Sequence, residues 1–179
     1  MKSFQISDPA DFTANADFFI NKLSRSYIKH KMDFFVFRDK TSSKKQLKII
    51  ANCLGKIQNR YKTKFIINTH QDLVKKPLGI WLNSKQFKQI LPLRKKGFFV
   101  IVSTHSLQDL RMVFKKRANL ASFSPIFYSK GKSKPKGTKA LKEINDKMRP
   151  KIIALGGINK TNLAQLEGIY GYAAISYFR

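Results

Sequence analysis

The sequence predicts an α/β protein, a compact (β/α)8 TIM barrel, and three observations carry this prediction. Eight short apolar runs, each followed by polar or turn-forming residues, recur along the 179 residues. Several of the runs are apolar throughout, which is typical of parallel strands that are buried on both faces. Segments with helical periodicity separate most of the runs, and eight parallel strands that alternate with helices close into a barrel.

The apolar runs define the strands in chain order. Each run has three to five residues, which suits a strand and is too short for a helix. The first run lies close to Met1 and the last ends at Ile175, just before Ser176. The predicted strands span residues 4–6, 34–37, 65–67, 78–82, 98–102, 120–123, 152–155 and 172–175.

Amphipathic segments between the strands predict the helices. Ser42 or Ser43 can cap the second helix and Asn159 or Thr161 the last, because side-chain oxygens accept the free amide hydrogens of a first turn. Cys53 occupies an apolar position of the second helix, and we expect a small buried thiol without a chemical role. The predicted helices span residues 11–29, 42–61, 84–91, 107–116, 139–148 and 160–166.

The length of the chain suits one domain over residues 1–179 but is short for this fold, which usually takes about 250 residues. Only residues 177–179 follow the end of the eighth strand, so the last helix is expected to be missing. The flank beside the first and eighth strands then loses its usual cover. We hypothesise that a second copy of the chain, as in a homodimer, or the N-terminal segment covers it.

An open, doubly wound sheet is the rival fold. Such a sheet would carry a Gly-x-Gly-x-x-Gly fingerprint after its first strand, where the backbone approaches a dinucleotide. This chain has Ser7, Asp8 and Pro9 there, which disfavours the open sheet.

The charge of the chain is strongly positive, with 36 Lys and Arg against 10 Asp and Glu and a net charge of +26. This surplus attracts polyanions such as nucleic acid, acidic headgroups or phosphorylated metabolites. The lysines are spread over almost every segment, so a general compositional bias explains them equally well. No apolar run approaches the roughly 20 residues of a membrane span. We expect a cytoplasmic protein without a membrane partner, and nucleic acid as a partner is disfavoured because no recognition module is present.

Polar residues follow most of the strands and should meet at the carboxyl end of the barrel, where sites of this fold lie. The strongest local signal is the glycine pair Gly156 and Gly157 between a strand and a predicted helix. Such a turn lets backbone amides approach a phosphate, with help from the helix N-terminus. With Ile175 and Ser176 on the neighbouring strand, it predicts a phosphate cup; the alternative is a plain tight turn.

Several motifs resemble the thiamine phosphate synthase and TenI family. Residues 35–40, FVFRDK, resemble the family's V-Q-L-R-D-K strand, and residues 103–106, STHS, resemble its S-T-H segment. Residues 124–132, from Ser-Pro-Ile-Phe to Lys132, resemble G-P-I-F-P-T-x-T-K. Residues 154–176 follow the pattern from A-I-G-G-I to G-A-D-G-V-A-V-I-S. The resemblance spans nearly the whole chain and is most specific in its last third.

By this resemblance, a synthase joins an aminopyrimidine diphosphate to a thiazole phosphate and releases pyrophosphate. Arg38, Lys40, Asn68 and Lys132 match positions that hold the diphosphate, where fixed cations stabilise a departing anion. For Lys132, a solvated surface charge is the alternative. Gly156, Gly157, Ile175 and Ser176 match the thiazole phosphate site.

The departures from the family pattern concern the metal. Val36 replaces a glutamine, and Thr69 and Gln86 replace the two aspartates that would hold magnesium. A hard cation needs carboxylate oxygens, so no metal ligand and no cofactor are expected, although the resemblance itself implies magnesium. Asp72 could reach inward or be an ordinary helix-start carboxylate. We hypothesise that Lys85 neutralises the anion in place of the metal.

His105 is the candidate catalytic residue, because it matches the histidine that transfers a proton in TenI-type thiazole tautomerases. An imidazole with a pKa near neutrality can take and return a proton, although a structural histidine is the alternative. His70 could line the same site, whereas His30 is expected at the surface. Three functions stay open: a TenI-like enzyme acting on a thiazole phosphate, a metal-poor synthase, and a catalytically degenerate barrel that binds phosphate or polyanions.

Overall fold

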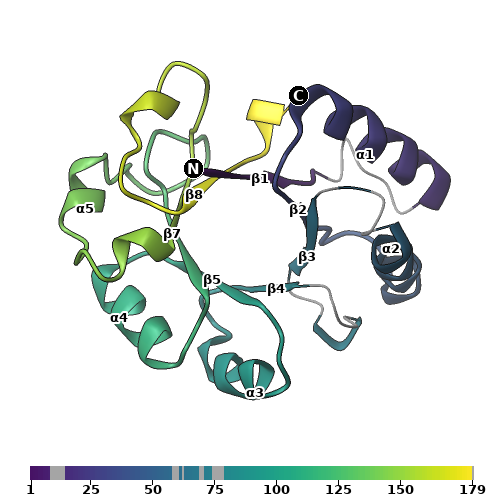
Figure 1. The fold of residues 1–179 in the computed structure, drawn as a ribbon, viewed down its shortest axis with the longest axis horizontal. Helices are drawn as coiled ribbons and strands as arrows, with labels where there is room; N and C mark the ends of the chain where they lie inside the picture. Colours follow the sequence, from purple (N-terminus) through teal and green to yellow (C-terminus); the bar gives the residue numbers. More distant parts are fainter. Residues whose placement is uncertain (9–14, 58–60, 62, 69–70, 74–78, 179) are drawn as a thin grey trace.

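A computed structural model describes residues 1–8, 15–57, 61, 63–68, 71–73 and 79–178. Eight strands form a closed barrel in chain order. The barrel closes where β1 pairs in parallel with β8 (Figure 1). The predicted α/β barrel is therefore confirmed, and the open sheet is wrong because β1 pairs with both β2 and β8. The strands are β1 (Lys2–Ile6), β2 (Phe34–Phe37), β3 (Lys64–Asn68), β4 (Gly79–Leu82), β5 (Val100–Thr104), β6 (Leu120–Phe123), β7 (Ile152–Leu155) and β8 (Gly171–Ala174).

Helices surround the ring of strands on its outside (Figure 1). The α-helices are α1 (Ala16–His30), α2 (Lys44–Ile57), α3 (Ile90–Lys95), α4 (Leu107–Lys115) and α5 (Lys139–Lys142). Short 3-10 helices complete the connections: η1 (Gln71–Leu73), η2 (Phe87–Gln89), η3 (Arg149–Lys151), η4 (Leu163–Gln165) and η5 (Ser176–Phe178).

Two predicted helices are largely absent. The segment 139–148 forms a single α-helical turn, α5, and the segment 160–166 forms only η4. Asn159 caps this segment as predicted, since its side-chain oxygen accepts hydrogen bonds from the amides of Thr161 and Asn162. The segment nevertheless stops after η4, because Leu166 has an extended backbone and Gly168 a φ of +66°. In addition, the helix predicted at 84–91 begins later, as η2 and α3, and the strand predicted at 98–102 is shifted to β5.

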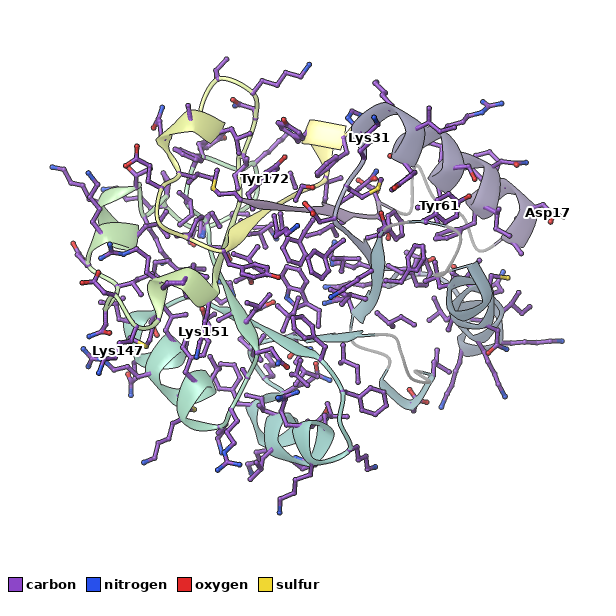
Figure 2. All side chains as sticks on the ribbon, in the orientation of Figure 1. Asp17, Lys31, Tyr61, Lys147, Lys151 and Tyr172 are labelled. Atoms are coloured by element: carbon purple, nitrogen blue, oxygen red, sulfur yellow. The ribbon has the colours of Figure 1, made fainter. Side chains whose placement is uncertain are left out.

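The strands are apolar throughout because both of their faces are buried. In β2, Phe34 and Val36 belong to the cluster inside the barrel, whereas Phe35 and Phe37 belong to the cluster between barrel and helices. Inside, the rings of Phe4 and Phe34 stack with centroids 4.2 Å apart. Figure 2 shows side chains filling the centre of the ring, so the barrel interior is a core and not a channel.

The last residues cover the outer face of β8. The described chain has no α-helix after β8, as predicted, and η5 takes that place. Phe178 is 5% exposed and stacks on Tyr172 of β8, with centroids 6.3 Å apart. Its ring also meets the edge of His30 at the end of α1. The C-terminal residues therefore supply cover on this face, whereas cover by a second copy stays a prediction and the N-terminal segment lies partly outside the described residues.

Two side chains differ from the sequence-based expectation. Cys53 is half-buried, not buried. His30 is half-buried as well, and its Nε2 atom is shielded from solvent, so the prediction of a surface histidine is wrong. Within the described residues, no helix has the length and apolarity needed to cross a bilayer.

Candidate active site

The carboxyl ends of the strands bring most of the predicted site residues to one end of the barrel. Arg38 follows β2 and continues the inward-facing series of Phe34 and Val36. Ser7, which follows β1 and is 1% exposed, fixes the backbone of Arg38. Its hydroxyl accepts from the Arg38 amide (2.8 Å) and lies 3.0 Å from the Arg38 carbonyl oxygen, to which it donates. Both bonds use backbone atoms of Arg38, so they hold its backbone at the rim without using the N–H donors of its guanidinium.

Asp39 is a buried carboxylate with a structural task. It accepts hydrogen bonds from the amides and the hydroxyls of Thr41 and Ser42, at 2.6–3.0 Å. Burial acts to raise the pKa of Asp39, but the bonds from Ser42 and Thr41 outweigh it and lower the pKa overall. The carboxylate therefore organises the turn that leads to α2, and the neighbouring Lys40 is exposed.

Asn68 ends β3 and reaches across to β4. Its side-chain amide donates to the carbonyl oxygen of Trp81 at 3.0 Å. The indole N–H of Trp81 in turn donates to the hydroxyl of Ser103 on β5 at 3.0 Å. Thr69 and His70 lie outside the described residues, so the candidate role of His70 stays a prediction.

His105 lies at the end of β5 and is exposed at the mouth. Its backbone amide donates to the carboxylate of Asp109 at 2.9 Å, next to the capping box that starts α4. Its Nδ1 atom lies 3.2 Å from the carbonyl oxygen of Ser124 and 3.3 Å from the Ser124 hydroxyl. Ser124, at the end of β6, is the functional neighbour that sequence reasoning missed.

The glycine pair has a packing role that the sequence did not reveal. Gly156 and Gly157 have φ angles of +99° and +64°, which favour glycine. A Cβ on Gly157 would lie 2.1 Å from the carbonyl oxygen of Tyr128. The loop after β6 crosses this turn closely, with the amides of Ile126 and Phe127 donating to the carbonyl oxygens of Leu155 and Gly156.

The structure contains only part of the predicted phosphate cup. Ile175 packs on the inner cluster and Ser176 is exposed at the start of η5, on the strand next to the glycine turn. However, η4 replaces the predicted helix after the glycines, so no α-helix N-terminus supports the cup. The remaining donors are backbone amides of the turn and the Ser176 hydroxyl.

Lys132 stands apart from the strand ends. It is exposed in the loop after β6, where its backbone amide donates to the carbonyl oxygen of Ser129 at 3.1 Å. A lysine further along the same loop, Lys136, places its ammonium 5.4 Å from the ring centroid of Phe123. The structure therefore brings Arg38, Asn68, His105 and the glycine turn to one end of the barrel, with Lys40 and Lys132 exposed near or beyond its rim.

The described residues do not fit a magnesium site. Among them, no group of three or more His, Cys, Asp or Glu side chains could hold a metal ion. Asp39 is occupied by its own turn, and Asp72 pairs with Lys44 at 2.5 Å, as an ordinary surface carboxylate does. Gln86 accepts from the Asn83 amide, and Lys85 is exposed beside it. A hard cation would find too few carboxylate oxygens here.

Comparisons with known proteins identify the family and agree with this fold. A family model of thiamine monophosphate synthase matches residues 6–178. The chain belongs to this family. A putative thiamine-phosphate synthase 2 of Aquifex aeolicus is 30% identical over 148 residues, which are 79% of this chain and 80% of that protein. The thiamine-phosphate synthase of Shouchella clausii is 29% identical over 142 residues, or 75% of this chain and 68% of that protein.

Solved structures support the fold. Thiamine phosphate pyrophosphorylase from Pyrococcus furiosus superposes with a TM-score of 0.76 at 20% identity, over 98% of this chain and 85% of that one. The resemblance to the thiamine monophosphate synthase family is thus confirmed over nearly the whole sequence. The chain is a thiamine-biosynthesis family protein with a barrel of the family's type.

Proposed function

We propose that this member of the thiamine monophosphate synthase family binds a thiazole phosphate at the barrel mouth, where His105 transfers a proton in a TenI-like tautomerisation. The observation that carries the proposal is the position of His105. Its imidazole is exposed at the mouth, while its Nδ1 side is held by Ser124. An oriented and accessible imidazole is what proton transfer to and from a bound ring requires.

The contact with Ser124 selects the tautomer. A carbonyl oxygen only accepts hydrogen bonds, so the 3.2 Å contact calls for a proton on Nδ1 of His105. Nε2 then carries the lone pair and acts as the base. It takes a proton from a carbon of the thiazole phosphate and returns it to another carbon of the same molecule. The reaction needs no metal and no second substrate.

The phosphate would be held at the ends of β7 and β8, away from His105, which follows β5. The amides of the turn at Gly156 and Gly157 and the hydroxyl of Ser176 supply donors without charge, as backbone anion sites do. Arg38 adds a fixed cation whose backbone is held by Ser7. This division leaves His105 free for the reacting ring.

The test is proton exchange into a thiazole phosphate, followed by NMR in D2O, together with calorimetric titration of the same compound. For His105→Ala we expect the exchange rate to fall at least about 100-fold, because general base catalysis contributes at least this much. The affinity should stay within about threefold, since His105 is not assigned to the phosphate. Gln108→Ala, an exposed change in α4, is the matched control. Unchanged exchange in His105→Ala would refute the proton-transfer role.

A metal-poor synthase is the second candidate. It is favoured by the names of the relatives in Aquifex aeolicus and Shouchella clausii, both thiamine-phosphate synthases. In this reading, Arg38, Lys40, Asn68 and Lys132 hold the pyrimidine diphosphate, and Lys85 neutralises it where the described residues offer no metal site.

Titration with the pyrimidine diphosphate, with and without magnesium, separates the candidates. Release of pyrophosphate when both substrates are present would establish the synthase. Strong magnesium dependence would refute the role of Lys85, whereas magnesium dependence that arises only in Lys85→Asp would support it. If neither compound binds, the remaining candidate is a degenerate barrel that binds polyanions.

A further inference from the structure

A cavity of about 350 Å³ lies on the flank of the barrel, outside the ring of strands. It is bounded by α1, by β1, and by the end of the chain after β8, which lies beside α1 in Figure 1. Its volume is within the range of about 300–1,000 Å³ that is common for small-molecule sites. Its lining residues are Gln5, Ile6, Asp8, Lys22, Arg25, Ser26, Lys29, His30, Ile175 and Phe178.

Cations dominate the wall that α1 contributes. Lys22, Arg25 and Lys29 are three and four residues apart, so they share one face of the helix. Asp8 is the one carboxylate among the lining residues of the cavity. With three cations against one carboxylate, the lining carries a net positive charge, which favours an anion because field lines concentrate in such clefts.

The floor of the cavity is polar. Ser26 and Gln5 are 9% and 4% exposed, and the Ser26 hydroxyl lies 2.7 Å from the Gln5 side-chain oxygen. This bond uses the oxygen of the Gln5 amide, so the two N–H groups of that amide are not consumed by it. A buried polar floor beneath a basic wall suits a ligand with oxygen acceptors.

His30, which also lines the cavity, has a polar atom without a partner in the described part of the chain. Its Nε2 is buried and has no hydrogen-bond partner among the described residues. Burial, followed by the charges of Lys29 and Lys160, lowers the pKa of His30. Because Nε2 is shielded from solvent, it offers no hydrogen bond to a ligand in this structure. The imidazole still borders the cavity and can report on an anion bound there.

The other occupants of this flank fit less well. A second copy carries a net charge of +26 and would bring like charge against the basic wall. A packed helix would need an apolar face to cover, but Tyr172 and Ala174 on the outer face of β8 are already buried, with η5 against it. The surface that remains is charged and small, which favours a small ligand.

We propose that this flank cavity, which borders the phosphate cup at Ile175, is a second binding site for a small polyvalent anion that carries phosphate or diphosphate groups. Lys22 and Arg25 contribute the charge, and the Gln5 amide contributes hydrogen bonds. The site does not depend on the function proposed for the mouth.

The test is a titration of the full chain with inorganic pyrophosphate, followed through the imidazole NMR signals of its three histidines. His30 reports the flank and His105 the mouth, and His30→Gln identifies the first signal. We expect a saturable shift of the His30 signal. In Lys22→Gln/Arg25→Gln, the dissociation constant from this signal should rise at least about tenfold, because two charge-assisted contacts are lost.

The matched control is Lys95→Gln/Arg111→Gln, which removes one exposed lysine and one exposed arginine from α3 and α4 and leaves the same net charge. Its dissociation constant at the His30 signal should stay within about twofold of the parent chain. Equal weakening in both double variants would show general charge attraction and overturn the proposal. So would a pyrophosphate titration that moves only the His105 signal, or none.

Discussion

The carboxylate of Asp39 shows how much one buried acid contributes to this protein. It accepts four hydrogen bonds from Thr41 and Ser42, and its pKa is lowered although burial alone would raise it. A carboxylate whose pKa is lowered in the folded state stabilises the fold at pH values above the pKa of the unfolded state, about 3.9. This contribution disappears as the pH falls through the folded pKa.

We therefore expect Asp39→Asn to lower the free energy of unfolding by about 1–3 kcal/mol at pH 7, measured by urea denaturation. The difference from the parent chain should shrink as the pH falls below the unfolded pKa of about 3.9 and through the lowered pKa of the folded carboxylate. Asp146→Asn is the control, because its side chain is 89% exposed and its surface pair with Arg149 contributes little. A difference that does not change with pH would contradict this account of Asp39.

Gly157 offers a second test at the level of a single residue. In Gly157→Ala, the new Cβ would clash with the Tyr128 carbonyl oxygen, and its φ of +64° is unfavourable for alanine. Gly131→Ala carries a similar φ of +73° but meets no atom within 4 Å, so it isolates the backbone cost of about 1 kcal/mol.

We expect Gly157→Ala to lose more stability than Gly131→Ala, by at least about 1 kcal/mol, because a clash adds to the backbone cost. It should also release the loop after β6, so that trypsin cleaves faster at Lys130 or Lys132. Equal losses of stability and equal cleavage rates in the two variants would mean that the close approach between Gly157 and the Tyr128 carbonyl oxygen does not affect stability.

At the level of secondary structure elements, the short helix η5 lies where the last α-helix of the barrel would be expected. Its two aromatic side chains, Tyr177 and Phe178, pack against Tyr172 of β8. Phe178 is buried between Tyr172 and the edge of His30. Phe178→Ala should lower the free energy of unfolding by about 3 kcal/mol, as core Phe→Ala changes do. Phe18→Ala removes the same group from a site that is 51% exposed, and we expect a loss below about 1 kcal/mol. Similar losses in both would show that η5 does not close the flank.

The elements also show where sequence patterns succeed and fail. The runs in β2, β6 and β7 were predicted with their observed bounds, because strands buried on both faces have a simple apolar signature. The helices after β6 and β7 were overpredicted. There, the side chain of Asn145 accepts from the backbone amide of Lys147, and the extended backbone of Leu166 ends η4. Amphipathic periodicity records neither feature.

At the level of the whole molecule, the charge of +26 acts against folding. Like charges repel in the compact state, and salt screens them as the Debye length falls from about 30 Å at 0.01 M to about 8 Å at 0.15 M. We expect the midpoint of thermal unfolding to rise by a few degrees when NaCl is raised over this range. A neutral additive at equal osmolality is the control. A midpoint that stays constant or falls with salt would contradict net self-repulsion.

Local patterns and motifs predicted the number of strands, the family, and the strand-end positions of Arg38 and His105, because these features depend on neighbours along the chain. Tertiary structure alone assigned Gly157 to the Tyr128 loop, Ser124 to His105, and Phe178 to the flank beside His30. It also showed the basic flank cavity. Each of these features joins segments that are distant in sequence, and no single stretch of residues records how closely they approach.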